Sequence, residues 1–136
     1  MNIQPVSRAY WCAFIGIVML ALPSQVEAQS PAETEQMFDS FTISLVAASR
    51  CDQPDERTMS RFLGNLMVVQ EAMLSQLRGR YPRADEKTLL SIIDKRIARL
   101  GQSVEKNIAQ LGCMDASIIR LVRLFEMNAR SNLFRN

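Results

Sequence analysis

Histidine is absent from this chain of 136 residues. Its absence excludes imidazole as a metal ligand or general base, and with it the catalytic triads and zinc motifs that depend on histidine. Glycine and proline are scarce, with five residues of each, which is too few for a turn-rich all-β fold. The 16 basic and 14 acidic residues give a net charge of only +2. We therefore expect no role in nucleic-acid binding.

The first 28 residues have the pattern of a secretory signal peptide. Arg8 supplies a positive charge, residues 9–22 form an uncharged apolar run, and Pro23 interrupts that run. Ala28 then stands at the last position before a cleavage site. An uncleaved membrane anchor is the alternative, but this run of 14 residues is shorter than the about 20 that a membrane span needs. We expect cleavage after Ala28 and export, with residues 1–28 removed.

The chain also lacks N-x-S/T glycosylation sites, which favours a bacterial periplasm over a eukaryotic secretory route. After cleavage two cysteines remain, Cys51 and Cys113. Disulfides form and persist in exported proteins, so we predict a Cys51–Cys113 bond, with two buried thiols as the alternative. No C-x-x-C spacing is present, and the predicted bond is therefore structural rather than redox-active.

Four helices are predicted in a single domain over residues 29–136. Ser30 and Glu33 form a capping box at the first start, and the third and fourth starts are capped by Asp85 and Asp115. The Asp and Pro residues of the connector over residues 50–55 indicate the second start. Gly79 is expected to cap the end of the second helix, with Pro82 preventing its continuation, and Gly112 is expected to end the third. The predicted ranges are 31–49, 54–78, 85–111 and 116–130. The apolar stripe of the second helix comprises Met59, Phe62, Leu63, Leu66, Met67, Val69, Met73, Leu74 and Leu77.

The short connections make successive helices antiparallel neighbours. The expected fold is an all-α, up-down-up-down four-helix bundle, with a long helical hairpin in the middle of the sequence and two shorter outer helices. In that topology the end of the first helix and the start of the fourth lie at the same end of the bundle. Cys51 and Cys113 occupy these two places, so the topology and the predicted disulfide agree.

No motif predicts catalysis. The sequence contains no phosphate-binding loop, nucleophile elbow or calcium loop, and its paired charges have the spacing of solvated helix faces. We expect no enzyme, no catalytic residue, no metal site and no small-molecule cofactor. The enzymatic alternative, a carboxylate-based hydrolase, requires two buried acidic residues facing one pocket.

A candidate partner surface is predicted near the turn over residues 79–84. The second and third helices are longer than the first and fourth, which the disulfide fixes to the opposite end, so an apolar patch ringed by arginines is expected there. Its members are Met73, Leu74, Leu77, Arg78, Arg80, Tyr81, Arg83, Leu89 and Ile92. The alternatives are that residues 131–134 continue the fourth helix and cover this patch, and that the arginines form an ordinary solvated surface.

A basic stripe is predicted on the fourth helix, at Arg120, Arg123 and Arg130, where it could meet anionic lipid or acidic protein. Six methionines follow the signal segment, and methionine serves either as core filler or as a flexible binding surface. These are Met37, Met59, Met67, Met73, Met114 and Met127.

The favoured hypothesis is an exported, non-enzymatic helical binding or adaptor protein of the cell envelope or exterior. Its expected partner is another protein or a second copy of the chain. The alternative is a membrane-surface or chaperone-like protein that uses the basic fourth helix and methionine-rich apolar faces.

Overall fold

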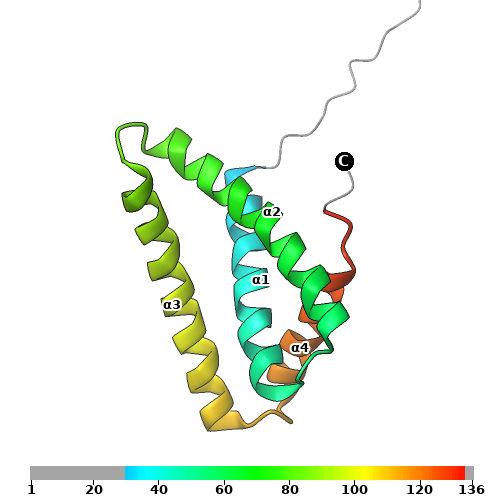
Figure 1. Ribbon diagram of the computed structural model, residues 1–136. Helices are drawn as coiled ribbons and strands as arrows, with labels where there is room; N and C mark the ends of the chain where they lie inside the picture. Colours follow the sequence, from blue (N-terminus) through cyan, green and yellow to red (C-terminus); the bar gives the residue numbers. More distant parts are fainter. Residues whose placement is uncertain (1–29, 134–136) are drawn as a thin grey trace, which may run out of the picture.

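The computed structural model describes residues 30–133 of the chain (Figure 1). Within this range there are four helices and no strand: α1 (Pro31–Cys51), α2 (Glu56–Arg80), α3 (Glu86–Leu111) and α4 (Ala116–Arg130). The predicted all-α, up-down-up-down four-helix bundle is confirmed, and α2 and α3 are its two longest helices. The signal peptide predicted over residues 1–28 lies outside the described residues. None of α1–α4 combines the length and the apolar character that a helix needs to cross a membrane.

Side-chain caps define where the helices begin. Ser30 and Glu33 form the predicted capping box: Glu33 N–H donates to Ser30 Oγ at 3.3 Å, and Ser30 N–H donates to Glu33 Oε2 at 2.7 Å. The other three helices begin after an aspartate whose carboxylate accepts a backbone N–H from the first turn: Asp55, Asp85 and Asp115. Each cap satisfies a donor that the helix itself leaves free, so the predicted starts are confirmed to within two residues.

Proline rather than glycine sets the end of α2. The prediction that Gly79 ends this helix is wrong, because α2 continues through Gly79 to Arg80 and is capped by Tyr81. Pro82 follows, and the residue before a proline is disfavoured in the helical conformation, so the helix stops there. Gly112 does end α3, with a φ of 80° that glycine adopts without steric cost.

The core is built around α1, which packs against each of the other three helices. Its centre is aromatic: the ring centroids of Phe41 and Phe62 lie 5.1 Å apart, and those of Phe62 and Phe125 lie 4.3 Å apart. These rings join α1, α2 and α4, and all are at most 2% exposed. Rings at such separations contribute beyond the area that they bury, so direct aromatic packing holds these three helices together.

The predicted disulfide is confirmed. Cys51 is the last residue of α1 and Cys113 lies in the connector between α3 and α4, with their Cα atoms 5.5 Å apart. The bond joins the end of α1 to the segment that carries the chain from α3 into α4.

An ion-pair network provides the second attachment of α3 to α1. Arg96 of α3 binds Asp39 with two hydrogen bonds, Nε to Oδ1 at 2.6 Å and Nη2 to Oδ2 at 2.9 Å. Its Nη1 also lies 3.1 Å from Glu35 Oε2, and Arg80 of α2 reaches Glu35 Oε1 at 2.8 Å. All but Arg80 are less than a third exposed. A paired guanidinium in this geometry fixes the orientation of the two helices as well as stabilising them.

Removal of the disulfide is expected to destabilise the fold substantially. The two cysteines are 62 residues apart in the sequence, and a loop of that length corresponds to about 4 kcal/mol in the chain-entropy account of disulfides. We expect the double variant Cys51→Ala, Cys113→Ala to lose a stabilisation of that order in urea unfolding. Free-thiol titration of the natively produced protein provides the companion measurement, and two reactive thiols there would contradict the pairing.

Glu35 is expected to make stability depend on pH. A hydrogen bond from Arg80, together with the charge of Arg96, lowers the pKa of Glu35 below its ordinary value of 4.5. Because the pKa is lower in the folded than in the unfolded chain, the stabilisation is fully present above pH 4.5 and is lost as the pH falls through the folded pKa. Glu35→Gln should therefore destabilise the protein near neutral pH and lose less stability than the wild type on acidification.

Urea unfolding at about pH 7 and about pH 3 measures this difference. Glu105→Gln is the matched control, because it removes an ion pair with Arg50 whose side chains are 49% and 63% exposed. Exposed pairs contribute at most about 1 kcal/mol. An acid response of Glu35→Gln equal to that of the wild type would show that the network does not act through this carboxylate.

Candidate functional site

The apolar patch predicted at the turn over residues 79–84 is largely buried. Four of its predicted members are at most 8% exposed: Met73, Leu74, Leu77 and Leu89. The prediction of an exposed patch is wrong for these residues. The reason is the reach of α1, whose first turns lie beside the end of α2, where Gln76 donates a hydrogen bond to Glu35. Its 21 residues span roughly 30 Å, so α1 covers this end although Cys51 is fixed at the other.

The chain after α4 also folds onto the core, but not as a helix. The alternative that residues 131–134 continue the fourth helix is wrong in that respect, since α4 ends at Arg130 and Ser131 has extended backbone. Asn65, which is fully buried in α2, donates to the Ser131 carbonyl at 2.8 Å. Leu133 then packs against the core cluster. Phe134 lies outside the described residues.

The polar members of the predicted partner surface lie at the surface, but two of the three arginines are engaged within the chain. Arg78 contacts Glu71 at 3.2 Å and Glu86 at 3.8 Å. Arg80 contacts Glu35 at 2.8 Å. The remaining members are exposed or half-buried: Tyr81, Arg83 and Ile92. These ion pairs reduce the charge that the turn offers to a partner.

Exposed apolar side chains gather instead in the first half of α2 and in the second turn of α3. Leu63 and Met67, which the sequence pattern placed in the buried stripe of α2, are 44% and 69% exposed. Val68 is 39% exposed, and Leu90 of α3 is 45% exposed although its neighbour Leu89 is buried. In Figure 1, α2 and α3 leave the turn at residues 81–85 and diverge. Their divergence leaves the apolar sides of both helices incompletely covered.

A groove of about 320 Å³ runs between these two helices. We call it the α2–α3 groove; α2 contributes Met67, Gln70, Glu71 and Leu74, and α3 contributes Leu90, Ile93, Asp94 and Ile97. Its floor is apolar, because Leu74 and Ile93 are at most 8% exposed and lie in the core. A shallower hollow on α2 adjoins it and shares Met67 and Glu71. The apolar surface therefore continues from the groove onto the outer side of α2.

The charged rim of the α2–α3 groove is acidic. Glu71 and Asp94 are its two charged members, and both are exposed. Glu71 forms an ion pair with Arg78, whereas Asp94 has no ion pair among residues 30–133. An apolar floor with an acidic rim favours an occupant that is apolar along one side and basic at its edge.

The predicted basic stripe lies on the outer side of α4. Arg120, Arg123 and Arg130 are exposed, and Met127 among them is 67% exposed. Arg130 pairs with Glu126 at 3.2 Å. The apolar residues of α4 point the other way, into the core, where Phe125 has no exposed surface. The stripe thus combines positive charge with a single large apolar side chain.

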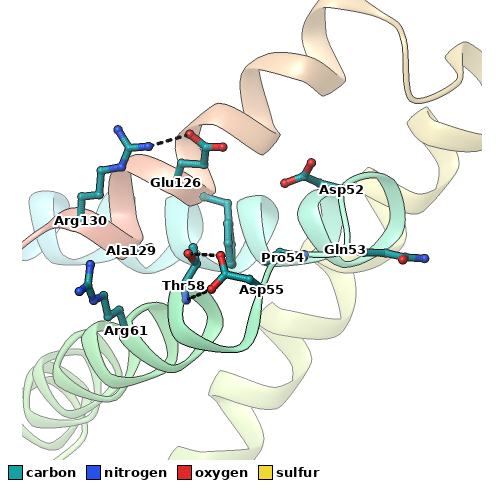
Figure 2. Close-up of a pocket in the computed structure, with 10 residues that line it drawn as sticks. Asp52, Gln53, Pro54, Asp55, Thr58, Arg61, Glu126, Ala129 and Arg130 are labelled. Atoms are coloured by element: carbon teal, nitrogen blue, oxygen red, sulfur yellow. Dashed lines mark hydrogen bonds and ion pairs between the residues drawn. The ribbon is translucent and has the colours of Figure 1, made fainter.

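A second cavity, the connector pocket, lies at the disulfide end of the bundle (Figure 2). Its volume is about 340 Å³, and it is bounded by residues 52–55, the first turns of α2 and the last turns of α4. Asp52, Asp55 and Glu126 are exposed at its surface, and no carboxylate among the described residues is fully buried. In the same range, no group of three or more cysteine, aspartate or glutamate side chains is arranged to hold a metal ion.

No protein-family model matches this chain, and no curated protein or solved structure matches it.

The α2–α3 groove was not predicted from the sequence. The signal that could have indicated it is the width of the apolar arc on α2. Leu63 and Met67 extend that arc beyond what one neighbouring helix covers, and Leu90 adds an apolar residue directly after the buried Leu89.

The two adjacent leucines of α3 provide a test of the groove's placement. Leu89→Ala removes a side chain that is 2% exposed, and such truncations cost about 2–5 kcal/mol. Leu90→Ala removes one that is 45% exposed, and we expect a loss below about 1 kcal/mol. Chemical denaturation of both variants makes the comparison. Equal losses would mean that Leu90 is part of the core and the groove is closed.

Proposed function

We propose that this chain is an exported, non-enzymatic binding protein whose α2–α3 groove receives an apolar helical segment of another protein. The observation that carries the proposal is the exposure of Met67 and Leu90 on the two walls of a groove with a buried apolar floor. Exposed apolar side chains scattered singly are ordinary, but a contiguous set beside a groove marks interaction surfaces.

The shape of the groove supports a helical occupant. Its two walls are themselves helices, and an amphipathic helix can place side chains at positions i, i+3, i+4 and i+7 between them. Met67 suits such a role because an unbranched thioether side chain adapts to different apolar partners. Burial of a half-exposed side chain of the groove such as Leu90 would contribute about 1 kcal/mol.

The charges of the rim support a basic edge on that helix. Asp94 carries a carboxylate with no ion pair in the part of the chain that the structure describes. A lysine or arginine beside the apolar side of the partner helix would lie opposite Asp94 and Glu71. Rim charges of this kind act mainly on partner choice and association rate.

Export is supported by two features of the chain. The Cys51–Cys113 bond is of a kind that persists in oxidising compartments, and the first 28 residues have the pattern of a cleaved signal peptide. These features support our proposal that the protein and its partner act in the cell envelope or outside the cell.

A membrane-surface role for α4 has weaker support. An interfacial helix buries a broad apolar side in the lipid, whereas the apolar side of α4 is occupied by the core, with Ile118, Phe125 and Ala129 at most 3% exposed. Met127 alone supplements the charges of Arg120 and Arg123 on the outer side. Liposome co-sedimentation distinguishes the two: the proposed function predicts that anionic vesicles do not retain the protein.

The proposed function is tested with a synthetic amphipathic helix of leucine and lysine, about 18 residues or 27 Å long. We expect it to bind the oxidised protein in a fluorescence titration, and we expect a matched peptide of leucine and glutamate to bind at least about tenfold more weakly. Met67→Gln should weaken binding of the lysine peptide by about tenfold, because it places a polar group where an apolar contact is needed.

Met127→Gln is the matched control. Met127 is 67% exposed and Met67 is 69% exposed, so the two substitutions are chemically equivalent and differ only in location. We expect Met127→Gln to leave the affinity unchanged. If both variants bind the peptide equally, or if the glutamate peptide binds as well as the lysine peptide, the groove is not the binding site.

A further inference from the structure

The connector pocket holds charges that the rest of the fold does not use. Its floor is made by Phe125 and Ala129, which are 0% and 3% exposed. The Phe125 ring stacks on Phe62 at 4.3 Å, so this floor belongs to the aromatic core. The wall formed by residues 52–55 directly follows Cys51 and its disulfide. The pocket therefore rests on the aromatic core and lies beside the disulfide.

Three of its charged groups already have partners. The Asp55 carboxylate accepts hydrogen bonds from Thr58 Oγ1 at 2.6 Å and Thr58 N–H at 3.0 Å, and these hydrogen bonds lower the pKa of Asp55 below its ordinary value. Asp55 thus remains charged as the cap of α2. Glu126 and Arg130 pair with each other at 3.2 Å, on the same side of α4.

Two further charged groups have no such partner. Neither Arg61 nor Asp52 makes a side-chain hydrogen bond or an ion pair with any residue from 30 to 133. Figure 2 shows Arg61 on the same side of the pocket as Arg130, and Asp52 on the opposite side. The pocket therefore presents positive charge at one side and an unpaired carboxylate at the other, above an apolar floor.

Backbone hydrogen bonds hold the connector beside the end of α1: the N–H groups of Asp52 and Gln53 both donate to the Ala48 carbonyl, at 3.0 Å and 3.3 Å. Gln53 has a φ of 51°, in the left-handed region that residues other than glycine seldom adopt. Pro54 comes next. A non-glycine residue in this conformation directly before a proline is disfavoured locally, so the surrounding structure holds it, as is common at binding sites.

We propose that the connector pocket binds a small zwitterion that carries a carboxylate and an ammonium group, namely a free amino acid or a dipeptide. The carboxylate would lie against Arg61 and Arg130, the ammonium group against Asp52, and an apolar side chain over Phe125. A volume of about 340 Å³ is at the small end of the range for ligand pockets. This inference is independent of the α2–α3 groove.

The charges of the pocket disfavour simpler ligands. An anion such as phosphate would face three carboxylates, those of Asp52, Asp55 and Glu126, against two guanidinium groups. A lone amine would leave Arg61 without a partner. A zwitterion satisfies both unpaired groups at once.

The test is a titration of the oxidised full chain, followed by NMR of the backbone amides of residues 52–61, with leucine and with the dipeptide alanyl-leucine. The two probes distinguish the two sources of the same chemistry. We expect one of them to bind, and we expect its N-acetylated and its amidated forms to bind at least about tenfold more weakly, because each lacks one charge.

Protein variants assign each charge to its partner. Asp52→Asn should weaken binding of the free zwitterion by about tenfold and should abolish the effect of N-acetylation. Arg61→Gln should abolish the effect of amidation in the same way. Arg57→Gln is the control, because Arg57 is exposed one turn earlier on α2 and does not line the pocket. The affinity of the Arg57→Gln variant for the zwitterion should equal that of the wild type.

Two results would overturn the proposal. One is the absence of any shift in residues 52–61 at millimolar concentrations of both probes. The other is a result in which N-acetylation or amidation of the probe lowers its affinity by the same factor for the wild type, Asp52→Asn and Arg61→Gln. The charges of the probe would then not be recognised by these residues.

Discussion

The attachment of α3 to α1 is the constraint on which the shape of this molecule depends. The Cys51–Cys113 disulfide holds the C-terminal end of α3 near the C-terminal end of α1. Between the ends of α3, Arg96 binds Asp39 and Glu35 of α1. The turn at residues 81–85 joins α3 to α2 only at one end (Figure 1). Because α3 is held against α1 at these points, it cannot close onto α2 along its whole length, and the α2–α3 groove lies where the two helices diverge.

This arrangement separates the stabilising core from the groove that we propose as a binding site. The aromatic contacts of Phe41, Phe62 and Phe125 join α1, α2 and α4, away from the exposed walls of the groove. Met67 and Leu90 therefore stay exposed without weakening the core that positions them. The connector pocket differs from the groove, because its floor is part of the aromatic core. Its charged residues lie on the connector and on the helix ends around that core.

Features that depend on neighbouring residues in the sequence could be predicted, and features that depend on distant ones could not. The caps at Ser30, Asp55, Asp85 and Asp115 depend on a side chain and a backbone donor two or three residues away, which the sequence displays directly. The topology and the disulfide followed from two cysteines and short connections. Arg96 binds Asp39 and Glu35, which precede it in the sequence by 57 and 61 positions. Nothing local distinguishes Arg96 from the solvated charges around it. For the same reason the pattern could not tell that Leu63 and Met67 would lack a covering helix, or that α1 would cover Leu74 and Leu77.

The methionine methyl groups report directly on whether the α2–α3 groove binds an apolar helix. NMR of the protein labelled at these methyl groups observes Met67 at the groove together with two internal references, Met114 and Met127, which are 86% and 67% exposed elsewhere. On addition of the leucine–lysine helix, we expect the Met67 signal to shift in a saturable manner while the signals of Met114 and Met127 stay in place. Equal shifts at all three methionines, or a shift confined to Met127, would show that the helix does not bind in the groove.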